Sequence, residues 1–124
     1  MKTIILIGVF GLILASSTFA DVAGTYNGSG TNPDGSKYDT KVIITKTGAS
    51  FLVQWYFNDA LGYEGVGIVK NKLLCVGFAN PNGYGVVVYE IKSDDSLDGV
   101  WTGPGGGELK TEKLYKGEDK GEEI

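Results

Sequence analysis

The sequence predicts an all-β protein built as a single antiparallel up-and-down meander of about eight strands. Apolar and polar residues alternate over short segments of about six to nine residues, and turn-forming residues separate these segments. No segment shows the apolar spacing of a helix. Aromatic residues recur beside glycines at alternate positions, as in Gly24-Thr25-Tyr26-Asn27-Gly28 and Gly99-Val100-Trp101-Thr102-Gly103.

The short links between the predicted strands favour a closed or nearly closed small barrel. Strands that follow each other closely in sequence usually pair with each other. A meander of eight strands leaves two unpaired edges, and closure into a barrel removes both. Glycines within strands allow the tight coiling that closure requires. A two-sheet sandwich is the alternative, and an eight-stranded barrel is either filled by side chains or holds one small ligand.

Turn signals divide the chain into its elements. Asn32-Pro33-Asp34-Gly35 predicts a turn, because proline presets φ and glycine accepts the left-handed conformation. Lys70-Asn71 predicts a tight turn in which Asn71 has a positive φ. Asn80-Pro81-Asn82-Gly83 is the strongest hairpin signal. The expected strands are residues 22–30, 38–46, 51–57, 62–69, 72–79, 84–92, 97–103 and 109–115.

The alternation assigns faces to some of these strands. Phe51, Val53, Trp55 and Phe57 share one face of residues 51–57. Residues 72–79 are apolar on both faces, which predicts a central strand in which Cys75 is a buried, inert thiol. Three consecutive valines, residues 86–88, leave the inward face of their strand undecided.

Residues 1–20 have the features of a signal peptide. Lys2 supplies a positive start, residues 4–15 are apolar, and Thr18 and Ala20 occupy the −3 and −1 positions of a cut before Asp21. The apolar run is shorter than the ~20 residues that span a bilayer. We therefore expect export to the periplasm or the extracellular space, without lipid attachment, because no cysteine lies near the cut.

The mature chain divides into a β domain, residues 21–116, and a short tail, residues 117–124, which is charged and expected to be disordered. No later segment is apolar enough to insert into a membrane after cleavage. Cys75 is the one cysteine, so no intrachain disulfide can form.

The residue types that are missing exclude several kinds of chemistry. The chain has no histidine and no arginine, which excludes Ser–His–Asp and Cys–His catalysis and histidine-based zinc sites. After cleavage, ten lysines face fifteen acidic residues, a formal charge of −5. An acidic chain without a basic patch is a poor nucleic-acid binder. We expect neither an enzyme nor a bound cofactor.

Two further clusters are interpreted as ordinary loops. Asp94, Asp95 and Asp98 supply fewer oxygens than Ca²⁺ needs, so we expect a solvated turn and no metal site. The glycine-rich residues 103–107 lack the Gly-Lys-Ser/Thr ending of a phosphate-binding loop. A carboxylate-based glycosidase would need two acids across a cleft, and Glu64 or Glu90 is a candidate for one of them.

Aromatic residues with a polar end suit an apolar pocket that carries a few fixed hydrogen-bond donors. They could equally fill a solid core. The candidate ligand-binding residues are Tyr26, Trp55, Tyr63, Tyr89 and Trp101.

Several spaced motifs resemble a family of small exported bacterial β-meander proteins, mostly uncharacterised and sometimes labelled fibronectin-binding. The resemblance covers nearly the whole mature chain. In shape, the expected barrel also resembles the avidin and lipocalin folds, and Gly24-Thr25-Tyr26 stands where lipocalins have Gly-x-Trp. The motifs are Gly24-x-Tyr26, Asn32-Pro33-Asp34-Gly35-Ser36-x-Tyr38, Tyr63-Glu64-Gly65-Val66-Gly67-Ile68, Gly85-Val86-Val87-Val88-Tyr89, Leu97-Asp98-Gly99-Val100-Trp101-Thr102 and Thr111-Glu112-x-Leu114.

These observations predict an exported, non-enzymatic binding module. It would recognise a small apolar ligand inside the barrel, or an extracellular protein or glycan through an aromatic–glycine face. One alternative is a rigid structural or inhibitor-like surface protein. Another is an enzyme that uses only carboxylates and tyrosines.

Overall fold

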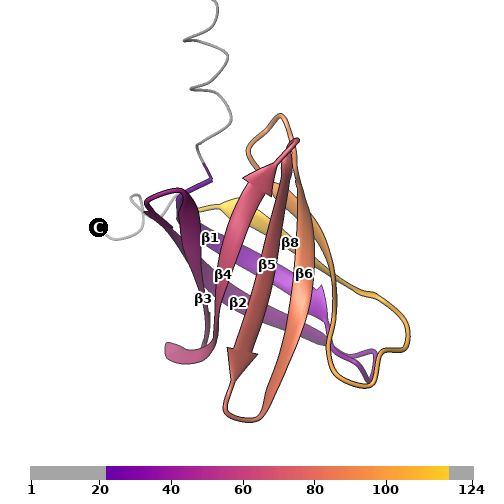
Figure 1. Cartoon of the computed structure of the whole chain (residues 1–124). Helices are drawn as coiled ribbons and strands as arrows, with labels where there is room; N and C mark the ends of the chain where they lie inside the picture. The colour runs from indigo at the N-terminus through magenta and orange to yellow at the C-terminus, as the bar shows by residue number, and fades with distance from the viewer. Residues whose placement is uncertain (1–21, 118–124) are drawn as a thin grey trace, which may run out of the picture.

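Eight antiparallel strands close into a barrel (Figure 1) in the computed structural model, which describes residues 22–117. The predicted signal peptide, residues 1–20, and residues 118–124 of the predicted tail lie outside the described residues. No helix within residues 22–117 is long and apolar enough to cross a membrane. The strands are β1 (Gly24–Thr31), β2 (Lys37–Thr47), β3 (Ser50–Phe57), β4 (Ala60–Lys70), β5 (Leu73–Asn80), β6 (Gly83–Ile91), β7 (Leu97–Thr102) and β8 (Lys110–Lys116).

Each strand pairs with the next one in sequence, and β8 returns to pair with β1. This last pairing runs from Tyr26 opposite Lys116 to Gly30 opposite Glu112. The predicted all-β meander and its closure are therefore confirmed, and the chain does not adopt the two-sheet alternative. Closure leaves no sheet edge exposed.

Two-residue turns connect four of the strand pairs: β2–β3, β3–β4, β4–β5 and β5–β6. Asn58 and Asp59 join β3 to β4, and Asn71 and Lys72 join β4 to β5, all four with positive φ. This is the left-handed geometry that matches the twist of a two-stranded hairpin, and the positive φ predicted for Asn71 is confirmed. Asn80 pairs with Gly83, so the strongest hairpin signal does form a tight turn between β5 and β6.

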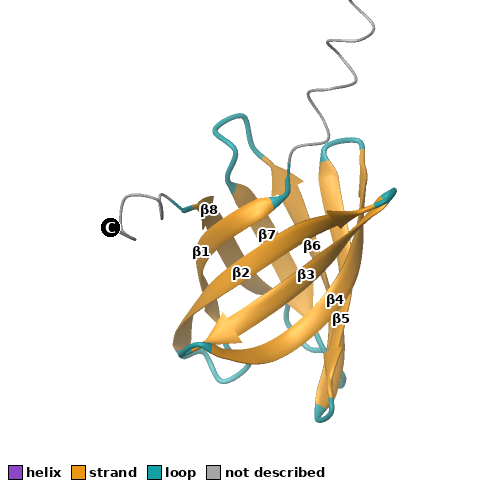
Figure 2. Cartoon of the chain, turned by 90° about the vertical axis from the view of Figure 1, so that its left-hand side faces the viewer, coloured by secondary structure: helices purple, strands orange, loops and turns teal. Residues whose placement is uncertain are grey.

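One end of the barrel is filled by a hydrophobic core. This end carries the β2–β3, β4–β5 and β6–β7 turns together with both ends of the described chain (Figures 1 and 2). Val22, which precedes β1, is buried there, and its carbonyl accepts a 2.7 Å hydrogen bond from the Tyr26 hydroxyl. Ile44, Leu74 and Leu114 are also fully buried. We call this the closed end.

The strands present alternate residues to the interior and to solvent. Val87 of β6 is buried inside the barrel, whereas Val86 and Val88 are exposed outside. This shows which face of the strand points inward, a question that the three consecutive valines left open. The expectation for residues 72–79 was wrong, because a closed barrel has no central strand covered on both faces. Cys75 lies on the outer face of β5 and is half-buried, not buried as predicted.

The outer surface of β4, β6 and β7 carries several exposed apolar side chains. These are Val66, Ile68, Val86, Val88 and Val100. The glycines of the same strands, such as Gly65, Gly67 and Gly99, are buried on the inner face. The aromatic–glycine alternation seen in the sequence therefore belongs to the interior of the barrel.

Candidate functional site: a cavity at the open end of the barrel

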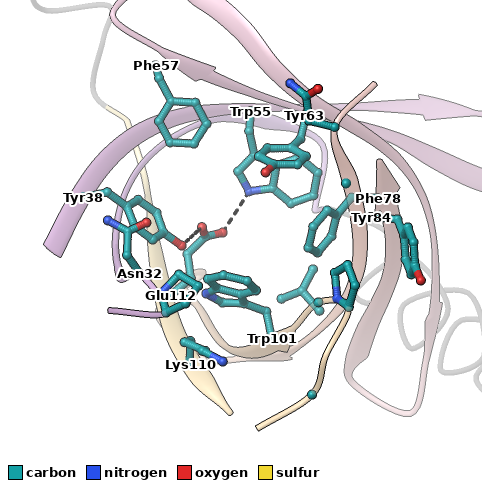
Figure 3. A pocket seen from close by; sticks show the side chains of 17 residues that line it. Asn32, Tyr38, Trp55, Phe57, Tyr63, Phe78, Tyr84, Trp101, Lys110 and Glu112 are labelled. Carbon is teal, nitrogen blue, oxygen red and sulfur yellow. Dashed lines mark hydrogen bonds between the residues drawn. The ribbon is translucent and has the colours of Figure 1, made fainter. Parts of the chain in front are cut away.

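The end of the barrel opposite the closed end contains a cavity of about 350 Å³ (Figure 3). Its rim comes from the β1–β2, β5–β6 and β7–β8 connections, and its walls come from side chains on the strands below. This volume lies within the range of small-molecule sites in proteins. The lining residues are Asn32, Pro33, Tyr38, Trp55, Phe57, Tyr63, Phe78, Asn82, Gly83, Tyr84, Val87, Trp101, Gly103, Pro104, Gly106, Lys110 and Glu112.

Aromatic rings in mutual contact form much of the wall. The Phe78 ring lies at the centre of this group, with its centroid 5.4 Å from that of Trp55, 5.4 Å from that of Tyr63 and 6.3 Å from that of Trp101. The rings meet in tilted or edge-to-face orientations, which aromatic pairs prefer. Four residues from four different strands thus make one continuous aromatic surface inside the barrel.

The carboxylate of Glu112 lies at the inner end of the cavity, and its side chain is only 3% exposed. The Tyr38 hydroxyl donates a 2.6 Å hydrogen bond to Oε1. Oε2 accepts a 3.0 Å hydrogen bond from the Trp55 indole N–H and a short one from the Tyr89 hydroxyl. All three partners act as donors, as an ionised carboxylate requires because it can only accept.

The register of the sheet explains how the two tyrosines reach Glu112. Gly30 lies opposite Tyr38 on β2 and opposite Glu112 on β8. Gly99 lies opposite Tyr89 on β6 and also opposite Glu112. Tyrosine, glycine, glutamate, glycine and tyrosine therefore form one inward-facing row across five neighbouring strands, which we call the Tyr–Gly–Glu row.

Each glycine of the Tyr–Gly–Glu row makes room for a tyrosine ring. A Cβ atom on Gly99 would lie 2.6 Å from the Tyr89 ring, and one on Gly30 would overlap the Tyr38 ring. Such contacts are far shorter than packed carbon atoms allow. Because neither glycine has a side chain, each ring crosses its glycine to reach the carboxylate two strands away.

The surroundings of Tyr38 and Tyr89 raise the pKa of both phenols above the ordinary value of 10. Burial is the largest cause for each, and the negative charge of Glu112 is the next. The Trp101 indole N–H has a smaller, opposite effect on the pKa of Tyr38. Both hydroxyls therefore remain protonated at neutral pH and serve as donors to Glu112.

Two buried polar atoms near the mouth have no hydrogen-bond partner within residues 22–117. They are the indole Nε1 of Trp101 and the hydroxyl Oγ1 of Thr102. Trp101 lines the cavity, and its N–H lies near the Tyr38 hydroxyl without a well-formed hydrogen bond to it. Buried donors are normally satisfied, so this N–H is available to an acceptor that enters the cavity.

Three of the five predicted ligand-binding residues come together here. Trp55, Tyr63 and Trp101 line the cavity. Tyr89 lies beneath it, fully buried, and contacts Glu112. Tyr26 belongs to the closed end, where its hydroxyl is bonded to Val22 and the Lys116 ammonium lies 5.7 Å from its ring centroid.

Sequence reasoning missed Glu112, Tyr38 and Phe78. A signal for Glu112 was present, because Glu112 and Leu114 alternate on one face of the last strand, and the apolar Leu114 marks that face as the inner one. The two acids that were considered lie outside the barrel. Glu64 accepts a 2.9 Å hydrogen bond from Gln54, and Glu90 pairs with Lys92 at 3.4 Å.

Asp94 and Asp95 lie in the β6–β7 turn at the closed end, whereas Asp98 lies in β7. Asp94 accepts hydrogen bonds from the Ser96 backbone N–H at 3.0 Å and from its hydroxyl at 2.6 Å, and these contacts lower the pKa of Asp94. No group of three potential metal ligands occurs in the part of the chain that the structure describes. Asp94 therefore serves to shape this turn.

No protein-family model matches the chain, and no curated protein matches it. The barrel, its cavity and the residues that line it are therefore the features from which a function can be inferred.

Proposed function

We propose that this protein is an exported, non-enzymatic binding module that takes one small, mostly apolar ligand into the open end of its barrel. The observation that carries the proposal is the cavity of about 350 Å³, which has aromatic walls and a hydrogen-bonded carboxylate at its inner end. Small-molecule sites typically combine apolar walls with a few fixed polar groups. The predicted signal peptide supplies the export part of the proposal.

The size of the cavity favours a ligand over simple core packing. An apolar cavity of about 150 Å³ is already large enough to bind benzene in another protein. The cavity here is more than twice that volume. Protein interiors otherwise leave few voids larger than a water molecule, and buried apolar side chains such as Ile44, Leu74 and Leu114 fill the closed end of this same barrel.

The alternatives receive less support from the arrangement of residues. The aromatic–glycine pattern faces the interior, so it does not form a surface on which a protein or glycan could dock. Glu112 is the one carboxylate among the residues that line the cavity, whereas most glycosidases use two. A rigid structural or inhibitor-like protein would have no use for an open cavity.

The two tryptophans provide a direct test, because both Trp55 and Trp101 line the cavity and the chain has no others. We expect the tryptophan fluorescence of the purified domain to change saturably with at least one member of a panel of small aromatic and alicyclic compounds. The binding stoichiometry should be one. A panel in which no compound changes the fluorescence would contradict the proposal.

A matched pair of variants locates the binding. Val87→Phe adds a ring inside the cavity, whereas Val86→Phe adds the same ring on the exposed outer surface of the same strand. We expect Val87→Phe to weaken binding at least tenfold and Val86→Phe to leave it unchanged. Equal affinities for the two variants would place the ligand elsewhere.

A further inference from the structure

Glu112 brings a negative charge to the inner end of the cavity without a cation to balance it. Its three partners are two hydroxyls and an indole N–H, all neutral groups. Within residues 22–117, Glu112 takes part in no ion pair. Lys110 is the one lysine that lines the cavity, and its ammonium lies 5.8 Å from the Trp101 ring centroid. The hydrogen bonds stabilise the carboxylate but leave its charge in place, and attraction to a positive group is strong away from bulk water.

The rings around this charge also favour a cation. The faces of aromatic rings carry negative potential and attract an ammonium group within about 6 Å of the centroid. Lys110 already places its ammonium on Trp101 in this way. Trp55, Tyr63, Phe78 and Trp101 form the continuous aromatic surface that a second, deeper ammonium group would meet.

Glu112 has acceptor capacity left for such a group. An ionised carboxylate offers about four acceptor positions. Oε2 accepts two hydrogen bonds and Oε1 accepts one, from Tyr38. Oε1 can therefore accept one further N–H from a ligand.

From this combination we propose that the cavity binds a small organic amine, with its ammonium group between Glu112 and the aromatic rings and its apolar body toward the mouth. This inference rests on the ligand-binding function proposed above and adds the chemical class of the ligand. The buried Trp101 N–H would donate to an acceptor atom on the same molecule when one is present.

Three probes of similar size and different charge test this class: phenethylamine, 2-phenylethanol and phenylacetate. Tryptophan fluorescence or calorimetry on the wild-type domain measures their affinities. We expect the amine to bind about tenfold or more tightly than the alcohol, because it gains a charged hydrogen bond and cation–π contacts. Phenylacetate should bind most weakly of the three.

The outcomes separate the two proposals. If the alcohol binds as tightly as the amine, or if only uncharged members of the broader panel bind, the amine class is wrong while the ligand-binding function stands. If no compound of either set binds, the ligand-binding function itself fails.

Variants identify the group responsible for the preference. Glu112→Gln keeps the size of the side chain and removes its charge, so the preference for amine over alcohol should disappear. Lys110→Met removes the rim cation and should strengthen amine binding while keeping the preference. Near-ultraviolet circular dichroism checks that Glu112→Gln folds. If this variant does not fold, the affinities of the three probes for the wild-type domain still test whether the cavity prefers an amine. A folded Glu112→Gln domain that keeps the preference would overturn the role of Glu112.

Discussion

Tyr38 and Glu112 lie on either side of Gly30 in one inward-facing row, and the Tyr38 hydroxyl donates a 2.6 Å hydrogen bond to Glu112 Oε1. The ring crosses the backbone of β1 where that strand has no side chain. The same arrangement repeats on the other side of Glu112 with Gly99 and Tyr89. Glycines spaced along the sequence thus provide room for the polar network at the inner end of the cavity.

Replacing Gly30 by alanine should destabilise the fold, because its methyl group would overlap the Tyr38 ring. Forced overpacking of this kind costs about 1–3 kcal/mol. Gly77→Ala is the matched control, since a Cβ there meets no atom within 4 Å on the outer face of β5. It should be neutral or stabilising by about 0.5 kcal/mol, because alanine is less flexible than glycine in the unfolded chain. Urea unfolding measures the free energy of unfolding of both variants. Equal effects of the two substitutions would mean that Gly30 does not make room for the Tyr38 ring.

Removing the Tyr89 hydroxyl should cost about 1.5–3 kcal/mol, the usual contribution of a hydrogen bond to a charged group. Tyr89→Phe keeps the ring over Gly99 and leaves Oε2 of Glu112 with Trp55 as its one donor. Tyr115→Phe is the control, because Tyr115 is exposed on β8. Its unfolding free energy should match that of the wild type. A Tyr89→Phe domain as stable as Tyr115→Phe would show that the hydrogen bond contributes nothing net.

The barrel could be predicted from the sequence because its determinants are local. Alternation fixed the inner residues of β3, and turn residues such as Asn71 and the 80–83 hairpin fixed where strands end. Of the two aromatic–glycine motifs, the one at residues 99–103 contributes Gly99 to the Tyr–Gly–Glu row. These signals arise from residues that are close together in the chain, so a single sequence is enough to detect them.

The site could be predicted only in part, because it depends on which strands meet across the barrel. Trp55 and Trp101 come from β3 and β7, and no local pattern pairs them. Glu112 was missed because a single acid in a strand usually faces solvent, and its three donors lie at sequence separations of 23 to 74 residues. Whether the interior is open or filled depends on the summed volumes of all inward side chains and on the loops at the mouth.

Tyr38 and Tyr89 should resist ionisation at alkaline pH, because burial and the Glu112 charge raise the pKa of both above 10. In the unfolded chain both phenols ionise near their ordinary pKa. The folded state therefore holds more protons above pH 10, and its stability is complete below that pH and falls as the pH rises beyond it. Tyrosinate absorbance should show these two phenols ionising together with unfolding.

Tyr89→Phe provides the control for this pH dependence. The variant should lose less stability than the wild type between neutral pH and alkaline pH, since it has one shifted phenol fewer. If the native domain ionised all of its tyrosines near pH 10 without unfolding, the buried network around Glu112 would not exist as described.

Asp95→Gly should stabilise the barrel. The β1–β2 and β6–β7 connections share one backbone pattern: Gly35 N–H donates to Asn32 at 2.9 Å, and Asp95 N–H donates to Lys92 at 3.0 Å. Gly35 and Asp95 therefore occupy equivalent turn positions, with φ of 90° and 72°. A side chain at positive φ is strained by contact between Cβ and the backbone, and glycine is not. The gain should be about 0.5 kcal/mol, since part of the relief is offset by the greater freedom of glycine in the unfolded chain.

The reciprocal change and the neighbouring aspartate make this prediction specific to backbone strain. Gly35→Asp should lose about as much stability as Asp95→Gly gains, because it introduces the same strain into the equivalent turn. Asp94→Gly should destabilise instead, because Asp94 accepts both hydrogen bonds from Ser96. Thermal unfolding of the three variants measures these differences. An Asp95→Gly domain that is less stable than the wild type would mean that the Asp95 side chain makes a favourable contribution larger than the strain it causes.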